Sequence, residues 1–473
     1  MKRFPIILLC LTLFATAGCM VGPDYRKPKT DLPERWSIDP ASATADDQAV
    51  ALEAWWQTFS DPVLTRLIDM AQAGNRNVYQ AEARVLEARA RRKLAGAELL
   101  PTTSMSLGAS RTETASALRG INTELYSHTI DASWELDLFG KKRRALEAAE
   151  ASEEAKQEDL RDVLVSLYAE VALNYVDVRS YQTQLRITET NLATQTETYQ
   201  LTQWRQQAGL TTQLDVEQAK LALENTRASL ASQQSSLDQA KHNLALLLGK
   251  EPAALKTMLQ FGGDIPVASA ELVVGIPADL LRRRPDVRRA ERQLAAQTAQ
   301  IGVAEAERYP DFTLSGSIGL KSLEYANLYT AGAKASQIAA NAVLTLLDFG
   351  RNSSNIAIQK ALREQALGLY QGTLLTALRD VENALTAYVQ ERKRLVALQA
   401  AATAGREAFD LANFQYAAGL SDFQAVLESQ RSLLSAQTAL ATSQAEIAAD
   451  VIRLYKALGG GWPNDDQEQK EYE

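Results

Sequence analysis

The sequence predicts an α+β membrane protein: a trimeric, twelve-stranded transmembrane β-barrel that continues into a long α-helical barrel, with two tandem repeats in each chain. Three observations predict this fold class. The chain begins with an export signal, a set of short signatures occurs twice at an almost constant offset, and each copy combines heptad ladders with two alternating segments. Heptads are typical of helices that coil around one another, and alternation is typical of strands with one apolar face.

The composition excludes several classes of protein. The chain has 473 residues, 46% of them hydrophobic and 23% charged, and 50 Lys plus Arg against 58 Asp plus Glu give a formal charge of -8. This acidic balance makes nucleic acid a poor partner. Only one continuous apolar stretch occurs, which excludes a helical membrane transporter. Two histidines and two cysteines leave little material for a metal site or a catalytic triad, so we expect no enzyme, catalytic residue, metal or cofactor.

The N-terminus is typical of an export signal that is removed from the mature chain. A positively charged start and an apolar stretch, Phe4–Phe14, lead to small residues and Cys19. Ala17, Gly18 and Cys19 match the end of a bacterial lipoprotein signal, in which Cys19 becomes the acylated first residue. Because Thr16 stands where Leu is usual, ordinary cleavage after Ala17 stays open as the alternative.

Short signatures recur along the chain, first 209 and then 210 residues apart. The pairs are Pro101 with Pro310, Phe139-Gly140 with Phe349-Gly350, Ala208-Gly209-Leu210 with Ala418-Gly419-Leu420, and Leu248-Gly249 with Leu458-Gly459. A constant offset over such a distance indicates a duplicated unit, so both units should contain the same elements in the same order.

Heptad ladders predict a long helix and a shorter helix in each unit. In the first unit the ladders run from Leu164 to Tyr199 and from Val216 to Leu244, and both recur 210 residues later. No Pro or Gly interrupts Lys141–Gln207, which predicts a helix of roughly 100 Å at ~1.5 Å per residue. Gly209 and Gly419 stand where a left-handed residue would end a helix. The helices alone would also fit a filamentous coiled coil.

Four segments with a period of two predict strands and exclude the filament. They lie near residues 104–110, 126–137, 312–320 and 337–346. Their length suits barrel strands with apolar residues outward and polar residues inward, although soluble antiparallel sheets alternate too. The export signal favours the barrel. The two hairpins of one chain cannot close a barrel. Because open sheet edges cost too much free energy in lipid, several chains must combine to close it. Two chains would fill the interior with side chains, whereas three leave a lumen.

Motifs along the whole chain resemble those of one family. They are Cys19-Met20-Val21-Gly22-Pro23-Asp24-Tyr25, Trp55-Trp56 with Asp61-Pro62, Gly275–Leu281 with Arg283–Val287, Gln430–Leu433 and Leu458–Trp462. Together and in this order they resemble the outer membrane factors of tripartite efflux systems, the TolC-like family, in its OprM-like lipoprotein branch.

The resemblance implies a β-barrel in the outer membrane and a helical barrel through the periplasm. We therefore expect the passive exit channel of a tripartite efflux pump, a homotrimer in outer-membrane lipid, anchored through Cys19. The implied partners are a periplasmic adaptor and an inner-membrane pump, expected to be proton-driven. An exit duct for protein secretion and a structural coiled-coil envelope lipoprotein stay open as alternatives. The sequence does not identify the cargo, so drugs, solvents, dyes and metal ions all remain open.

The expected division of the chain follows the two units. It comprises a signal peptide (1–18), an extended strap with the first helix (19–74), repeat 1 (75–252), an equatorial linker (253–283), repeat 2 (284–462) and a C-terminal tail (463–473).

The periplasmic end should contain the candidate functional residues. The helix turns at Gly209-Leu210 and Gly419-Leu420 are expected to face the adaptor and pump. The resemblance implies a carboxylate ring that narrows the pore near the second turn, and Glu428, one turn beyond Gln424, matches it. The family position is often Asp, and Gln424 stands where Leu can occur, which implies a looser constriction. A solvated surface Glu is the alternative. The repeat partner of Glu428 is Gln218.

Three further features have simple interpretations. Six arginines between residues 282 and 292 indicate the start of a helix at Pro285, with the arginines paired to acids of neighbouring segments. Trp134 and Tyr126 could belong to an interfacial aromatic belt, and packing inside the equatorial belt is the alternative for Trp134. His128 stands alone on an apolar face and predicts no metal site.

Overall fold

The structure is a computed structural model that describes residues 20–29, 33, 36–37, 52–114, 121–260, 262–268 and 281–462. Cys19, the signal peptide before it, the tail 463–473 and most of the motif at 275–281 lie outside these residues. The chain forms two compact units. Unit 1 contains the strap segment 20–29 with the described parts of Ala83–Glu158 and Arg288–Gly372. Unit 2 contains the described parts of Asp31–Glu82, Asp159–Val287 and Thr373–Glu473.

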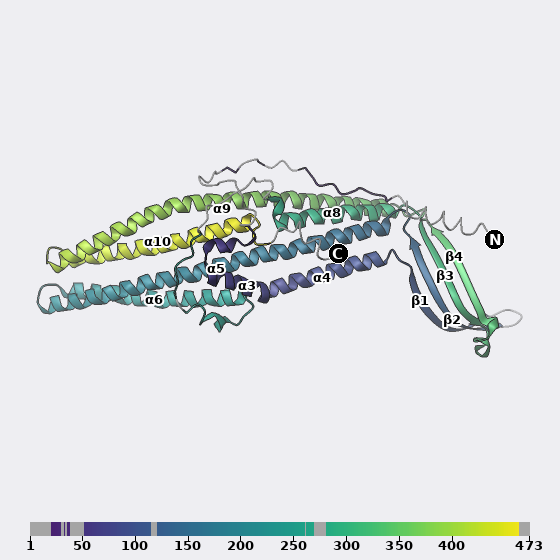
Figure 1. Cartoon of the computed structure of the whole chain (residues 1–473), viewed down its shortest axis with the longest axis horizontal. Helices are drawn as coiled ribbons and strands as arrows, with labels where there is room; N and C mark the ends of the chain where they lie inside the picture. The colour runs from purple at the N-terminus through teal and green to yellow at the C-terminus, as the bar shows by residue number, and fades with distance from the viewer. Residues whose placement is uncertain are drawn as a thin grey trace. The chain divides into compact units, whose positions relative to one another are not determined.

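The described elements follow the same order in both halves of the chain (Figure 1). They are η1 (Trp55–Phe59), α3 (Pro62–Gly74), α4 (Arg76–Ala97), β1 (Thr102–Thr114), β2 (Ile121–Leu136), α5 (Lys141–Gln207), α6 (Gln213–Leu247), η2 (Pro252–Leu255), α8 (Pro285–Ala306), β3 (Asp311–Ser322), η3 (Tyr325–Asn327), η4 (Ala331–Ala333), β4 (Lys334–Val343), α9 (Arg351–Ala417) and α10 (Phe423–Ala457). Corresponding helices have equal lengths: 22 residues in α4 and α8, 67 in α5 and α9, and 35 in α6 and α10.

The long helix α5 confirms the predicted bounds Lys141–Gln207. It begins where the Asp137 carboxylate accepts hydrogen bonds from the backbone N–H groups of Lys142 and Arg143, at 3.1 and 3.0 Å. An acceptor at this point satisfies N–H groups that have no partner inside the helix and suits the positive end of the helix dipole. None of the helices in the described part of the chain has the length and hydropathy of a membrane-spanning helix.

The four predicted strands are confirmed and form one antiparallel sheet in unit 1, ordered β1-β2-β3-β4 (Figure 1). On one face, Met105 lies opposite Ile130, and Ile130 lies opposite Ile318. All three side chains are more than half exposed. The prediction that the fourth strand extends to Leu346 is wrong. Strand β4 ends at Val343, because its partner β3 begins at the opposite residue, Asp311.

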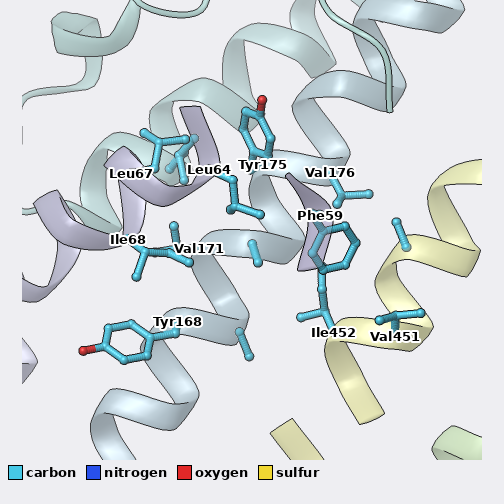
Figure 2. Packing of buried hydrophobic residues seen from close by; sticks show 14 of the residues in the cluster. Phe59, Leu64, Leu67, Ile68, Tyr168, Val171, Tyr175, Val176, Val451 and Ile452 are labelled. Atoms are coloured by element: carbon cyan, nitrogen blue, oxygen red, sulfur yellow. The ribbon is translucent and has the colours of Figure 1, made fainter. Parts of the chain in front are cut away.

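The core of unit 2 joins η1 and α3 to the long helices. Trp55 is 0% exposed, and its ring stacks on Tyr455 with a centroid distance of 5.6 Å. The Asp61 carboxylate caps α3 and accepts a hydrogen bond from the Tyr175 hydroxyl at 2.6 Å. Figure 2 shows the surrounding cluster, whose labelled members are Phe59, Leu64, Leu67, Ile68, Tyr168, Val171, Tyr175, Val176, Val451 and Ile452. The Trp-Trp and Asp-Pro motif is therefore a packing and capping motif.

Gly249, which ends α6, contacts Gly74 at the end of α3. A Cβ atom on Gly249 would lie 2.1 Å from the Gly74 carbonyl oxygen, and the backbone of Gly249 has a φ of +66°. Nearby, the side chain of Asn75 donates a hydrogen bond to the Leu247 carbonyl at 2.7 Å. Only glycine allows this close approach at a left-handed position. The glycine of the Leu-Gly signature therefore lets the ends of α3 and α6 pack directly against each other.

Candidate functional site

The strap, residues 20–29, is held to unit 1 by a buried arginine at the start of α5. Arg144 is 1% exposed. Its guanidinium donates hydrogen bonds to the carbonyls of Val21 and Gly22, at 3.1 and 3.2 Å, and to the Asp24 carboxylate at 2.8 Å. The strap backbone therefore satisfies a buried cation, which must have partners to be tolerated inside the protein.

Two further contacts of the strap involve α8. Gly22 has a φ of +91°, and a Cβ atom there would lie 2.4 Å from the Cα of Gly302, so only glycine fits. The Glu291 carboxylate accepts a hydrogen bond from the Tyr25 hydroxyl at 3.2 Å and pairs with the Lys27 ammonium at 2.6 Å. These contacts give a physical reason for the motif at the mature start. Sequence reasoning missed Arg144 and Glu291, because no local pattern in one sequence marks such distant partners.

Burial alone would raise the pKa of the Glu291 carboxyl. Hydrogen bonds and charge from Lys27 and Arg292 outweigh that effect and hold this pKa below its ordinary value. The Arg292 guanidinium also lies over the Tyr25 ring, 5.4 Å from its centroid. The carboxylate of Glu291 therefore acts as an ionised anchor for the strap.

The two predicted helix turns have the same backbone geometry. Gly209 and Gly419 have φ values of +73° and +77°, as the left-handed prediction required. Leu210 N–H donates to the carbonyl five residues before it, and Leu420 does the same, both at 2.8 Å. These bonds satisfy carbonyls that the ends of α5 and α9 leave free. Leu210 and Leu420 are 68% and 78% exposed, so each turn presents an apolar side chain.

An arginine links the two hairpins near these turns. Arg205 of α5 donates a hydrogen bond to the Tyr416 carbonyl at 2.8 Å, and its guanidinium lies 4.5 Å from the centroid of the Tyr416 ring. Tyr416 is buried against Phe423, which begins the last helix α10. Sequence reasoning missed this contact as well. A guanidinium over an aromatic ring contributes roughly 0.5–2 kcal/mol. The contact therefore stabilises the pairing of the two hairpins by a modest free energy.

Glu428 and Gln424 lie four residues apart on α10, and both side chains are exposed. The intervening Val426 and Leu427 are buried. Among the described residues, the Glu428 side chain makes no hydrogen bond or ion pair. Glu428 and Gln424 therefore share a face that is not covered within one chain. This placement fits both a pore-lining ring and a solvated surface, so the role of Glu428 stays a prediction.

Three of the six arginines near the start of α8, Arg284, Arg288 and Arg292, pair with acids as predicted. In unit 2, Arg284 binds Asp286 at 2.7 Å and Asp380 at 3.4 Å. In unit 1, Arg288 pairs with Glu158 at 3.0 Å, and Arg292 pairs with Glu154 at 3.2 Å. Helix α8 begins at Pro285, which confirms the predicted start.

Trp134 and His128 both lie in β2. The Trp134 indole N–H donates to the Leu99 carbonyl at 2.9 Å, so this end of the strand is tied to the chain before β1. The His128 ring nitrogen Nδ1 lies 3.2 Å from the Tyr329 hydroxyl. Within the described residues, no group of three or more His, Cys, Asp and Glu side chains could hold a metal ion.

Comparisons with known proteins agree over nearly the whole chain. A family described as outer membrane efflux protein matches residues 67–250 and 276–460. Nodulation protein T of Rhizobium leguminosarum bv. viciae is 35% identical over 466 residues, which cover 98% of this chain and 94% of the relative. The probable efflux pump outer membrane protein TtgC of Pseudomonas putida is 32% identical over 470 residues, 97% and 96% of the two chains. The solved structure of the outer-membrane channel OprN is similar with a TM-score of 0.87 and 34% identity, and the match covers 94% of this chain and 100% of that one.

Proposed function

The chain belongs to the outer membrane efflux protein family and is an outer-membrane exit channel for efflux, and we propose on this basis how it assembles and which residues control conduction. It resides in the outer membrane with a periplasmic extension. We propose that it conducts substrates passively, without catalysis, from a periplasmic adaptor and a proton-driven inner-membrane pump. The kinship with a protein named as an efflux pump component favours efflux over protein secretion and over a structural lipoprotein.

The single observation that carries the proposed assembly is the sheet of unit 1. In the part of the chain that the structure describes, strands β1 and β4 each pair on one side only, and the apolar face with Met105, Ile130 and Ile318 is exposed. Unpaired strand edges cost several kcal/mol per backbone group in lipid, so the sheet must close with other chains. We propose that three chains form a twelve-stranded barrel with a lumen, continued by a barrel of α5, α6, α9 and α10.

The trimer is tested by native mass spectrometry of the detergent-solubilised protein. We expect a mass of three mature chains, together with ion conductance when the same protein is added to a planar bilayer. A monodisperse monomer or dimer, or a trimer that never conducts, contradicts the proposed channel. The conductance also distinguishes a channel from a structural spacer, which would show none.

We also propose that the two halves of the chain are tandem repeats, with repeat 1 at 75–252 and repeat 2 at 284–462. The strap, the linker 253–283 and the tail 463–473 would then be additions to the duplicated unit. Equal helix lengths in the two halves support this division. The match of one family to two successive stretches of the chain supports it too.

We propose that Glu428, with Gln424 beside it, forms the narrow gate of the periplasmic end, next to the turns at Gly209-Leu210 and Gly419-Leu420. Three carboxylates about 6 Å apart would repel one another by ~0.7 kcal/mol per pair in water and by ~3 kcal/mol at an effective dielectric near 20. Repulsion of this size favours an open tip. The same three negative charges attract cations to the aperture. The exposed turns would be the surfaces that the adaptor and pump contact.

The gate is tested by reversal potentials measured across a salt gradient. Glu428→Lys should shift selectivity towards anions, and Glu428→Gln should reduce cation selectivity without loss of the trimer. Glu217→Lys is the matched control, because Glu217 is also exposed and lies on α6, one position before Gln218, the repeat partner of Glu428. If Glu428→Lys keeps the wild-type reversal potential, Glu428 is a surface residue and the constriction lies elsewhere.

A further inference from the structure

One row across the sheet of unit 1 is polar in every strand. Ser104 lies opposite Asp131, Asp131 lies opposite Ser317, and Ser317 lies opposite Gln337. Residues that lie directly opposite each other share a face of the sheet. These four side chains therefore form one line across the face that is opposite to the apolar face with Ile130.

Asp131 is the only charged residue in the middle of this polar face, within the described strands. The face carries Glu135 near the end of β2 that precedes α5, and it carries Lys321 towards the other end of the strands. Three rows of paired residues lie between these two charges, those of Ser133, Asp131 and Thr129, and only Asp131 is ionisable. A charge in this position dominates the local field of the face.

The surroundings leave the carboxylate of Asp131 open to ions. Residues of all four strands line a hollow of about 290 Å³ here, including Ser104, Ser317 and Gln337. The Thr129 hydroxyl donates a hydrogen bond to Asp131 Oδ2 at 3.1 Å and so fixes the orientation of the carboxylate. Within the described residues, no Lys or Arg pairs with Asp131.

We propose that Asp131 is a selectivity-determining residue of the β-barrel, where three copies form a ring that favours cations over anions. The proposal rests on the proposed trimer with its polar face inward. A barrel of twelve strands, ~4.8 Å apart and tilted by ~40°, has a backbone radius of roughly 12 Å. The three carboxylates would then lie on the order of 15 Å apart, beyond the Debye length of ~10 Å at 0.1 M salt.

At this spacing the ring differs from the gate at Glu428. Carboxylates that are screened from one another do not force the barrel apart, so the ring acts on permeating ions and not on the conformation of the channel. It would act as a second filter in addition to the proposed gate at Glu428. Cationic solutes would be concentrated near it, and anionic solutes would be depleted.

The test measures reversal potentials of conducting channels in planar bilayers. Asp131→Asn should lower the permeability ratio of K⁺ over Cl⁻ by about threefold at 0.1 M salt, and Asp131→Lys by more. The matched control is Glu124→Gln, which removes a carboxylate from the opposite face of the same strand and should leave the ratio unchanged. If Asp131→Asn and Asp131→Lys channels both keep the wild-type ratio, the inference is wrong, while wild-type conductance still supports the proposed channel.

A pair of adjacent cysteine variants gives an independent readout. A negatively charged methanethiosulfonate should change the conductance of Asp131→Cys channels and leave Ala132→Cys channels unaffected, because neighbouring residues of a strand point to opposite faces. The Ala132→Cys channel also controls for any reaction at Cys19. Equal responses of the two variants would overturn the placement of Asp131 in the lumen.

Discussion

Replacement of Arg144 by Ala should release the strap from unit 1. The guanidinium of Arg144 donates to two strap carbonyls, at Val21 and Gly22, and to the carboxylate of Asp24. It also donates to Glu147 one turn later in α5, at 2.7 Å. Alanine removes all of these bonds and the side chain that packs on Gly302, so the two strap carbonyls lose their donor in unit 1.

The expected cost follows from the individual bonds. Hydrogen bonds from a charged group contribute ~1.5–3 kcal/mol each, but they are not additive when one side chain makes all of them. The Asp24 side chain is 76% exposed, so its ion pair contributes at most ~1 kcal/mol. We therefore expect a loss of about 3 kcal/mol for docking of the strap, which is a change of roughly 100-fold in the equilibrium for local opening.

Limited proteolysis measures this equilibrium directly. Trypsin can cleave after Arg26, inside the strap, and the rate follows the open population when closing is fast. Arg144→Ala should be cleaved there about 100-fold faster than wild type, and Arg144→Lys, which keeps the charge but lacks the planar fork, should be intermediate. Arg91→Ala is the control, because Arg91 is exposed and, among the described residues, bonds only to Glu87. If Arg144→Ala is cleaved at the wild-type rate, the strap does not depend on this arginine.

Two further predictions concern the same end of the chain. Because the pKa of Glu291 lies below its ordinary value, its contribution to strap docking is complete above the unfolded pKa of ~4.3 and is lost as the pH falls through the lower folded value. Protection of the strap from proteolysis should therefore persist from pH 7 to 5 and fall in stronger acid, where an acid-stable protease measures it. Glu291→Gln should make this protection less dependent on pH. Protection that is already lost at pH 5 would contradict the role of Glu291 as an ionised anchor. Cys19→Ala should abolish incorporation of radioactive palmitate, and the protein should still assemble as a trimer. A wild-type mature chain that starts unmodified at Gly18 would show that cleavage after Ala17 is correct.

The elements that follow from local rules could be predicted closely. The uninterrupted run before Gly209 predicted the bounds of α5, because helix propensity and a left-handed terminator are properties of neighbouring residues. Pro285 predicted the start of α8 for the same reason. The end of β4 could not be predicted in this way. The alternation continues to Leu346, but a strand ends where its partner strand begins, and that depends on register.

The same distinction between local and long-range interactions separates the site residues that could be predicted from those that could not. The turns at Gly209 and Gly419 and the exposed position of Glu428 follow from helix geometry, so sequence patterns could locate them. Arg144 and Glu291 act on residues of the strap that are more than 100 positions away, and nothing near them in the sequence shows this role. Their charges alone would suggest surface residues, whereas Arg144 is among the most buried side chains of unit 1.

The strap also contacts the segment that follows the strand β2. Met20 packs against Gly140, where a Cβ atom would lie 2.6 Å from the Met20 side chain, and Gly140 follows the end of β2 by four residues. The strap is therefore attached to unit 1 next to the sheet as well as through Arg144 and Glu291. None of these contacts of the described strap pairs with the edges of β1 and β4. If three chains close the proposed barrel, its assembly depends on the pairing of these two edges between chains. We therefore expect the barrel to assemble in Cys19→Ala as well.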